Sequence, residues 1–330
     1  MSDELHMRRA IGNADTVRMH TSPNPWVGAV LVTVDGKVFD GATEPPGRRH
    51  AEIVALDAAR AAGVDTVGAT MFTTLEPCNH TGRTAPCTTA LVTAGISRVV
   101  VAVVDPDPQV AGSGLRALEA NGVSVTVGVL GDSVSSQLRP YLHHRRTGRP
   151  FVVLKLASTL DGRTAAADGT SRWITGEAAR TAVHRLRAES DAIVVGARTV
   201  RTDDPSLTTR LVDGPSPRRV VLGRAPAEAK VRPCLEWSGP LPELLDTLGR
   251  EGVLQLMVEG GATVAAAFHD AELVDRYVMH VAPALMGGDD GAPLLRGAGA
   301  ATISDLTALR IVGLRQLGDD IEIVLEKNPS

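Results

Sequence analysis

The stretch TTLEPCNHTGRTAPCTTA, residues 73–90, carries two of the three cysteines in the chain, Cys78 and Cys87. Upstream, HAE at residues 50–52 opens an apolar-periodic segment, which predicts a helix over residues 50–63. The imidazole of His50 and two cysteine thiolates make a borderline-soft ligand set that suits zinc. Three protein ligands leave the fourth tetrahedral position for water, as in catalytic zinc sites. We therefore predict a zinc site formed by His50, Cys78 and Cys87.

Glu52 is predicted to be the catalytic residue of this site. It lies two residues after His50, so its carboxylate falls near the metal without being a ligand. There it can move a proton between water and a leaving amine. Cys78 follows a proline and is predicted to open a helical turn, whose free N–H groups favour the thiolate. The combination of H-x-E with P-C-x-x-C is typical of zinc nucleobase deaminases, although here eight residues separate the cysteines.

The loop between the two cysteines is polar and could reach a substrate through Asn79, His80 and Arg83. Two simpler interpretations of this region remain open. His80 could be the fourth ligand of a structural zinc site, although a closed site would have no use for Glu52. Alternatively, the two cysteines could be unrelated core residues and His50 a surface residue.

Composition limits the classes of protein that the chain can belong to. Its 330 residues are 43% hydrophobic, which suits two globular domains of about 150 residues each. A net charge of −4 and 3% aromatic residues argue against nucleic-acid binding. Three cysteines are too few for a disulfide framework, so we expect a reducing, cytoplasmic setting. The chain shows no secretory signal and no apolar run of membrane-spanning length, so we expect no membrane partner.

The first half of the chain alternates predicted strands and helices, which is typical of an α/β domain. The expected elements are a helix at 3–18, a hairpin at 27–42 turned by Asp35-Gly36, the helix at 50–63, a strand within 68–78, a strand buried on both faces within 98–107, a helix at 114–122 and a strand at 123–130. The basic segment 141–150 is predicted to be the linker. It places the boundary near residue 148 and divides the chain into domains 1–148 and 149–330.

The second half repeats the α/β pattern. Strands are predicted within 151–163, 191–200, 218–224, 254–261 and 275–285, with an edge strand at 321–327 and a helix at 175–190 capped by Thr175. The glycine pattern of a Rossmann dinucleotide site is missing from the sequence. Gly260 and Gly261 instead lead into a helix of small residues, whose first N–H groups could bind phosphate. A tight turn between packed elements would have the same pattern.

Several motifs resemble the bifunctional deaminase/reductases of riboflavin biosynthesis. NPWVGAV (24–30), HAEIVAL (50–56) and TTLEPCNHTGRTAPC (73–87) resemble the deaminase half of that family. LKLASTLDGRTA (154–165), SRWITGEAAR (171–180), RTVRTDDPSLTTR (198–210) and VEGGATVAAAF (258–268) resemble the reductase half. The resemblance implies an N-terminal cytidine-deaminase-like three-layer αβα domain and a C-terminal dihydrofolate-reductase-like α/β domain. It also implies a homo-oligomer, expected to be a dimer.

The resemblance implies two successive reactions on nucleotide-like small molecules. The first is zinc-dependent hydrolytic deamination of 2,5-diamino-6-ribosylamino-4(3H)-pyrimidinone 5′-phosphate. The second is reduction by NADPH of the ribosyl group of 5-amino-6-(5-phosphoribosylamino)uracil to a ribityl group. The alternative is a zinc-dependent nucleobase deaminase joined to a nucleotide-binding module that is not a reductase.

The resemblance also assigns binding residues. Those facing the substrate are Asn24, His80 and Arg83 in the first half, and Ser171, Arg187, Leu207, Arg210 and Glu259 in the second. Those facing NADPH are Ser158, Trp173, Thr199, Asp203, Gly261, Ala262, Thr263, Val264, Ala265, Ala266 and Ala267. The guanidinium forks of Arg187 and Arg210 suit a sugar phosphate. Simpler interpretations stay open, since Arg187 could be a solvated helix residue and Trp173 a core residue.

Three positions depart from the pattern of the family. Thr43 stands where many members have a histidine seven residues before the zinc ligand, and Arg49 stands where proline is usual. Arg224 stands after a predicted strand, near where a small hydroxyl residue is frequent. The charge of Arg224 suggests the hypothesis that it meets the 2′-phosphate of NADPH.

Overall fold

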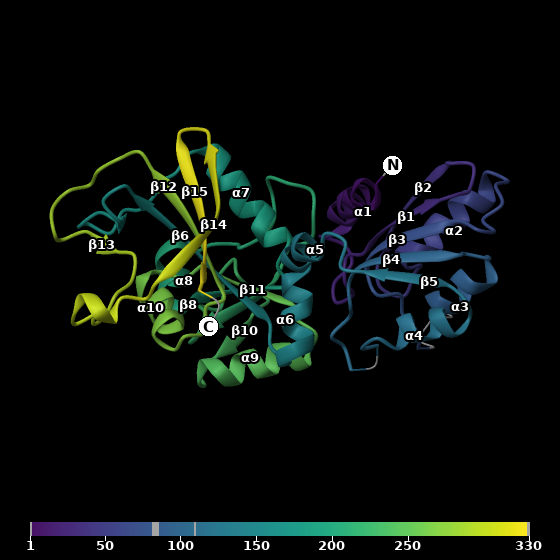
Figure 1. The fold of residues 1–330 in the computed structure, drawn as a ribbon. Coiled ribbons are helices and arrows are strands. Elements are labelled where there is room, and N and C mark those ends of the chain that lie inside the picture. The colour runs from purple at the N-terminus through teal and green to yellow at the C-terminus, as the bar shows by residue number, and fades with distance from the viewer. Residues whose placement is uncertain (1, 81–85, 109, 329–330) are drawn as a thin grey trace. The chain divides into compact units, whose positions relative to one another are not determined.

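The computed structural model describes residues 2–80, 86–108 and 110–328, and the chain divides into two compact units, Met1–Gly148 and Arg149–Ser330 (Figure 1). The prediction that residues 141–150 form a linker is wrong, because most of them belong to helix α6 (Arg139–Thr147). Proline near its start and Gly148, which adopts a positive φ just after its end, are helix boundary signals that the basic composition obscured.

The first unit is built on a five-stranded mixed sheet. Its strands are β1 (Gly28–Val32), β2 (Val38–Ala42), β3 (Thr70–Leu75), β4 (Arg98–Val103) and β5 (Ser124–Val127), in the order β2-β1-β3-β4-β5. β1 pairs antiparallel with β2 and β3, whereas β3, β4 and β5 run parallel. The predicted hairpin is confirmed. Burial of β4 on both faces is also confirmed, since all four of its central residues are buried.

Helices cover both faces of this sheet. The helices of this unit are α1 (Asp3–Val17), α2 (Ala51–Ala61), α3 (Cys87–Thr93), α4 (Ser113–Ala120), α5 (Gly131–Gln137) and α6. Gly28 packs against the backbone of α1, and Gly41 packs against the backbone of α2. Gly41 pairs with Ala29, so these two residues point to the same face of the sheet. Gly28 is the neighbour of Ala29 in β1, so it points to the opposite face. α1 and α2 therefore lie on opposite faces, which gives the three layers expected.

The second unit contains an eight-stranded sheet in the order β10-β9-β8-β11-β6-β12-β15-β14. Its strands are β6 (Phe151–Thr159), β8 (Ala192–Gly196), β9 (Arg218–Leu222), β10 (Leu235–Trp237), β11 (Gln255–Val258), β12 (Arg276–Ala282), β14 (Leu309–Leu317) and β15 (Asp320–Lys327). The first six in that order are parallel, and β15 and β14 are antiparallel additions. The prediction that 321–327 is an edge strand is wrong, because β14 covers β15. Two short strands, β7 (Arg163–Ala165) and β13 (Ala292–Pro293), pair separately.

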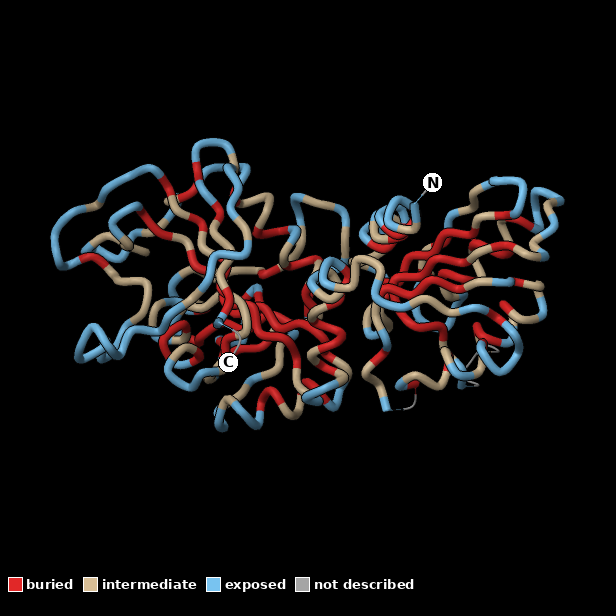
Figure 2. Tube along the Cα trace, viewed as in Figure 1, coloured by how far each residue is buried: buried red, intermediate tan, exposed pale blue. Residues whose placement is uncertain are grey.

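Four helices sandwich the large sheet: α7 (Glu177–Ala188), α8 (Ala197–Asp203), α9 (Leu241–Arg250) and α10 (Ala262–Asp270). Two neighbouring residues of β8 show which helices share a face. Val194 packs with residues of α9 and α10, whereas Ile193, which points to the other face of the sheet, packs with residues of α7 and α8. Burial on both faces accounts for the unbroken apolar run of β8 (Figure 2). Helix α7 starts after Gly176, and no side chain caps it, so the predicted Thr175 cap is wrong.

The α/β class of both units is confirmed, and the turn from β11 through Gly260 and Gly261 into α10 has the form expected. A 3₁₀ turn at Ile303–Asp305 precedes β14. No helix within the described residues is long and apolar enough to cross a membrane.

Replacement of Gly28 by alanine should destabilise the first unit. A Cβ at this position would lie 1.9 Å from the Ala10 carbonyl oxygen and 2.7 Å from the Ala14 nitrogen in α1. The helix must move away from the sheet, and overpacking of this kind costs about 1–3 kcal/mol. Thermal unfolding followed by circular dichroism measures the effect as a lower Tm.

Gly12→Ala is the matched control. Gly12 lies inside α1, and a Cβ there meets no atom within 4 Å. Alanine in a helix interior is favoured over glycine by about 0.8–1.0 kcal/mol, so the Tm should stay the same or rise. Equal effects of the two substitutions would contradict the close approach of α1 to β1.

Candidate functional site

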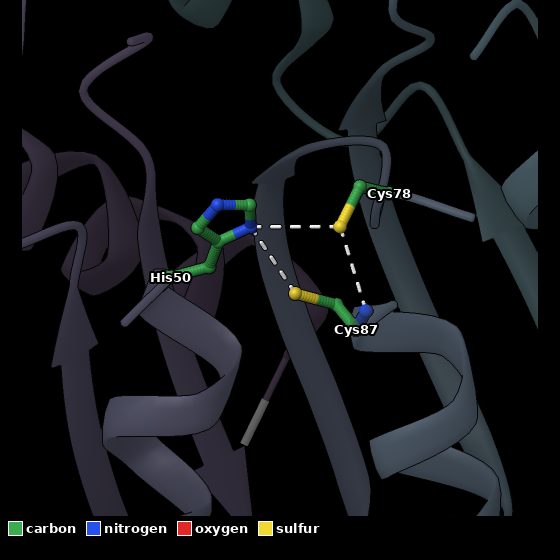
Figure 3. Close-up of side chains that lie close together, drawn as sticks. All are labelled: His50, Cys78 and Cys87. Carbon is green, nitrogen blue, oxygen red and sulfur yellow. Dashed lines mark hydrogen bonds between the residues drawn. The ribbon is translucent and has the colours of Figure 1, made fainter. Parts of the chain in front are cut away.

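Three side chains from separate elements meet at the carboxyl end of β3 (Figure 3). His50 is the residue before α2, Cys78 lies in the loop after β3, and Cys87 is the first residue of α3. The Nδ1 atom of His50 lies 3.5 Å from the Sγ of Cys78 and 3.3 Å from the Sγ of Cys87. Their three ligand atoms lie within 4.8 Å of one another.

The geometry of this group fits a tetrahedral zinc ion. Zinc bonds of about 2.3 Å to sulfur and 2.0–2.1 Å to nitrogen, at a tetrahedral angle, place those two ligand atoms about 3.6 Å apart. The two nitrogen–sulfur distances are close to this value. Nδ1 of His50 is the ring nitrogen that faces both sulfurs, so it is the donor available to the ion. His50, Cys78 and Cys87 could therefore hold zinc.

The electrostatics of the group favour a thiolate at Cys78. The backbone N–H of Cys87, the first of α3, donates to the Sγ of Cys78 at 3.4 Å. The hydrogen bond from the Cys87 thiol lowers the pKa of Cys78 to about 4, against the opposing effect of burial, and His50 and the Cys87 backbone N–H act in the same direction. The prediction that Cys78 itself opens a helical turn is wrong. The helix begins at Cys87, and its free N–H reaches back to the other cysteine.

Glu52 lies in the first turn of α2 and is 3% exposed. Burial, reinforced by the nearby Cys78 thiolate, raises the pKa of Glu52 to about 7. Within the described part of the chain, no carboxylate or second histidine joins the three ligand atoms, and His80 is exposed. The described residues therefore form an open three-ligand group with a buried carboxylate beside it.

The loop that carries Cys78 is held by a buried carboxylate that the sequence analysis missed. Glu76 accepts hydrogen bonds from the backbone N–H groups of Asp105, Gly112, Gly114 and Leu115. These donors lie in the loop after β4 and at the start of α4. A charged residue directly after the apolar strand, and before Pro-Cys, was the available signal. The hydroxyl of Thr88 adds a hydrogen bond to the Asn79 side chain at 2.8 Å.

The other residues singled out in the first unit lie at its periphery or in its core. Asn24 lies in the loop before β1, and its N–H donates to the Thr21 carbonyl. Arg83 falls within residues 81–85, outside the described residues. Thr43 is buried, and its hydroxyl bonds to the backbone of Val27 at 3.2 and 3.3 Å. Arg49 forms ion pairs with Glu44 and Asp57.

A largely buried ion pair organises the polar cluster of the second unit. The guanidinium of Arg187, on α7, donates to both carboxylate oxygens of Glu259 at 2.9 and 2.7 Å, and to the carbonyl of Thr208. The backbone N–H of Arg210 donates to Nδ1 of His184, three residues before Arg187 on the same helix. Three of the predicted substrate residues, Arg187, Arg210 and Glu259, therefore lie in one neighbourhood.

Burial sets the charge states in this cluster. It lowers the pKa of His184 to about 4, and the arginines act in the same direction, so the imidazole is neutral and accepts a hydrogen bond. Burial also lowers the pKa of Lys155, although Glu259 opposes it. Burial alone would raise the pKa of Glu259, but Arg187 and Lys155 together lower it. His184 was missed, although its i, i+3 spacing from Arg187 was a signal.

The structure excludes one of the alternatives for this cluster. Arg187 is 8% exposed, so it is not a solvated helix residue, and Glu259 already occupies its guanidinium fork. The side chain of Leu207 packs into the core, with a positive backbone φ of 52°, so its side chain is not open to a ligand. Arg210 is exposed, and its guanidinium bonds to the hydroxyls of Ser206 and Thr208.

The predicted cofactor residues meet where the neighbouring strands β8 and β11 end. Chain connections leave these two strands in opposite directions, toward β9 and toward β12, which is where α/β sheets bind ligands. A Cβ on Gly261 would lie 3.7 Å from the Thr199 hydroxyl, so the starts of α8 and α10 adjoin. In the described residues, nothing accepts the N–H groups of Ala262 and Thr263, which suits a phosphate.

The remaining cofactor candidates lie on other elements. Ser158 is buried near the end of β6, and Ser171 is half-buried in the loop before α7. Trp173 is 71% exposed, so the core interpretation is wrong, and the Arg180 guanidinium lies 4.8 Å from its ring centre. The carbonyl of Asp203 accepts a hydrogen bond from Arg172.

Comparisons with known proteins agree with both halves of this arrangement. Residues 1–103 match the cytidine and deoxycytidylate deaminase zinc-binding region, and residues 150–323 match the RibD C-terminal domain. The riboflavin biosynthesis protein RibD of Mycobacterium tuberculosis is 42% identical, over 97% of this chain and 96% of its own.

Solved structures agree along the whole chain. Acinetobacter baumannii RibD superposes with a TM-score of 0.92 at 36% identity, covering 99% of both chains. A Thermotoga maritima diaminohydroxyphosphoribosylaminopyrimidine deaminase/5-amino-6-(5-phosphoribosylamino)uracil reductase superposes with a TM-score of 0.90 at 32% identity, also over 99% of both chains. The chain belongs to the RibD family of bifunctional deaminase/reductases of riboflavin biosynthesis.

Proposed function

We propose that the chain deaminates 2,5-diamino-6-ribosylamino-4(3H)-pyrimidinone 5′-phosphate and then reduces the ribosyl group of the product with NADPH. Residues 1–148 are the deaminase domain and residues 149–330 the reductase domain. The observation that carries the proposal is the open group of His50, Cys78 and Cys87 beside the buried Glu52. The whole-length similarity to RibD proteins supports the joining of the two activities.

In the deaminase, His50, Cys78 and Cys87 are the residues that hold zinc. Zinc in such a site supplies Lewis-acid activation of water. Water adds to the amine-bearing carbon, the C–N bond breaks and ammonia leaves. Glu52 takes the proton from water and delivers it to the departing nitrogen, a task for which a pKa near neutrality is suited. Asn24, His80 and Arg83 bind the substrate.

In the reductase, NADPH supplies the hydride and the protein supplies orientation and charge. The hydride joins C1′ of the ribosyl group, the bond from C1′ to the ring oxygen breaks, and that oxygen takes a proton. Arg210, which is exposed, binds the sugar phosphate. Glu259 is positioned by Arg187, and Ser171 and the backbone of Leu207 complete the substrate pocket.

The NADPH site lies where the neighbouring strands β8 and β11 end. Its diphosphate lies at the start of α10, over Gly261 to Ala267, with Ser158, Trp173, Thr199 and Asp203 around it. The open N–H groups of Ala262 and Thr263 support this assignment. The alternative of a deaminase joined to a module that is not a reductase is disfavoured by the RibD C-terminal domain match. The thiols required for zinc suit a reducing cytoplasm.

Zinc content provides the first test. The purified protein should contain about one zinc ion per chain, and Cys87→Ala should lose most of it, because two ligands hold zinc far more weakly than three. Metal analysis by mass spectrometry after gel filtration measures the content. Cys234→Ala is the matched control, since this half-buried cysteine lies in the other unit and should leave the zinc content unchanged. Full zinc retention by Cys87→Ala would overturn the ligand assignment.

Glu52→Gln should abolish ammonia release while the zinc stays bound, because the amide cannot carry the proton. We expect a loss of at least about 100-fold, the size of a general acid–base contribution. Ammonia release from the diaminopyrimidinone nucleotide and NADPH oxidation with supplied deaminated product report the two steps separately. The oxidation should be unchanged in Glu52→Gln.

Arg210→Ala is the reciprocal variant, and it should weaken NADPH oxidation while sparing ammonia release. A harmless Glu52→Gln would indicate a structural zinc site without catalysis. Loss of both activities from either substitution would contradict two independent sites.

We also propose that the protein is a homodimer joined through β14. This strand is at the edge of the large sheet, and both of its faces are exposed. Ile311 and Leu314 on it are 63% and 67% exposed. An unpaired apolar edge strand is a template for pairing with another chain, and two identical strands can pair antiparallel about a twofold axis.

Leu314→Asp should convert the dimer to a monomer, because it places a charge in the proposed interface. Light scattering should show the mass falling from about twice 34.5 kDa to 34.5 kDa. Val67→Asp is the control, since Val67 is equally exposed but lies in the first unit. A monomeric wild type, or a dimer that survives Leu314→Asp, would exclude this interface.

A further inference from the structure

Two arginines follow the ends of neighbouring parallel strands in the second unit. β8 ends at Gly196, and Arg198 lies in the first turn of α8 that follows it. β9 ends at Leu222, and Arg224 lies two residues later. Gly196 pairs with Leu222 across the two strands. The residues just before the arginines also touch, because a Cβ on Gly223 would lie 3.1 Å from the Cβ of Ala197. The backbone therefore brings Arg198 and Arg224 to one place.

Both arginines are exposed and have no ion pair or hydrogen bond of their guanidinium groups within the described residues. Hydrogen bonds from Ala225 and Arg232 lower the pKa of Glu236, and the charge of Arg224 acts in the same direction. The carboxylate of Glu236 is already bonded to Arg232 at 2.6 Å and to the N–H of Ala225 at 3.1 Å. The positive charge of this arginine pair is thus left open to an anionic ligand.

The position of the pair relates it to the NADPH site proposed above. β9 lies next to β8, and β8 lies next to β11, so the end of β9 is two strand spacings from the start of α10. Two spacings amount to roughly 10 Å. A dinucleotide whose diphosphate lies at the start of α10 can extend along the strand ends toward β9. Its adenosine ribose then comes to the neighbourhood of Arg198 and Arg224.

We propose that Arg198 and Arg224 together bind the 2′-phosphate of NADPH and thereby select it over NADH. The inference rests on the proposed reductase function and deepens it, since it names the residues that recognise the phosphorylated cofactor. Two guanidinium groups can each donate a pair of N–H groups to phosphate oxygens. A hydroxyl residue at position 224 would give one neutral hydrogen bond, whereas arginine gives charge-assisted bonds. NADH has no 2′-phosphate, so the two arginines would add nothing to the binding of NADH.

Calorimetric binding of adenosine 2′,5′-bisphosphate and of adenosine 5′-monophosphate to the full-length protein tests the proposal without turnover. The wild type should bind the bisphosphate more tightly. Arg198→Ala and Arg224→Ala should each weaken bisphosphate binding by about tenfold or more and leave monophosphate binding unchanged, since a hydrogen bond to a charged group contributes about 1.5–3 kcal/mol. The double variant should bind the two ligands equally.

Arg185→Ala is the matched control. Arg185 is exposed on the last turn of α7, before the amino end of β8. Its replacement therefore removes the same charge at the opposite end of the strands. It should leave the preference for the bisphosphate intact. The proposal is overturned if neither Arg198→Ala nor Arg224→Ala changes the preference, or if Arg185→Ala changes it equally.

The same variants separate this inference from the proposed function. If the wild type oxidises NADPH with the deaminated substrate but the variants keep its preference over NADH, only the arginine assignment fails. If the wild type binds the bisphosphate through these arginines but shows no turnover, the reductase function fails and the phosphate site stands.

Discussion

Parallel pairing of strands is the constraint on which both sites depend. In the first unit, β3 and β4 run parallel, so the Cys78 loop and the loop after β4 emerge at the same edge. Glu76 joins them by accepting backbone N–H groups from the second loop and from α4. In the second unit, β8, β9 and β11 run parallel, so the residues after all three strands lie at one edge. Helices that return over a parallel sheet start at this edge, which brings their free N–H groups to the sites.

Each site contains a carboxylate that is largely removed from solvent, and its partners decide its charge state. A buried carboxylate is costly unless it is hydrogen-bonded or paired. Glu259 has two hydrogen bonds from Arg187, and its pKa falls. Within the described residues no arginine or lysine bonds to Glu52, and burial raises its pKa to about 7. The two glutamates therefore differ in charge state, since Glu259 is a fixed anion and Glu52 can exchange a proton near neutral pH.

Local patterns in the sequence were sufficient for much of this description. The grouping of His50, Cys78 and Cys87 could be predicted, because their residue types and the nearby Glu52 carry the chemistry. The alternation of strands and helices indicated the α/β class. The run of β-branched residues in β4 indicated that this strand is buried on both faces. Each of these signals lies within a few residues of the chain.

The features that were missed depend on contacts between distant residues. The helix that supports the Cys78 thiolate begins at Cys87, and only the path of the intervening loop decides this. The fork of Arg187 is occupied by Glu259, which lies 72 residues away in sequence. β15 became an interior strand because β14, which the sequence analysis did not identify, pairs with its open side. Alternation indicates that a segment is a strand but not what its neighbours are.

The arginines of the second unit differ in their partners, and the difference bears on function. Arg187 and Arg276 are paired with buried or nearly buried carboxylates, which fixes their position and neutralises their charge. Arg198 and Arg224 are exposed, and no carboxylate of the described chain bonds to them. A guanidinium already neutralised by a carboxylate gains little from a phosphate, because the phosphate must compete with the anion in place. A guanidinium that has only water as its partner can give its full set of donors to a dianion. The phosphate-binding capacity of this unit is thus set less by how many arginines it has than by which of them the fold leaves without an acidic partner.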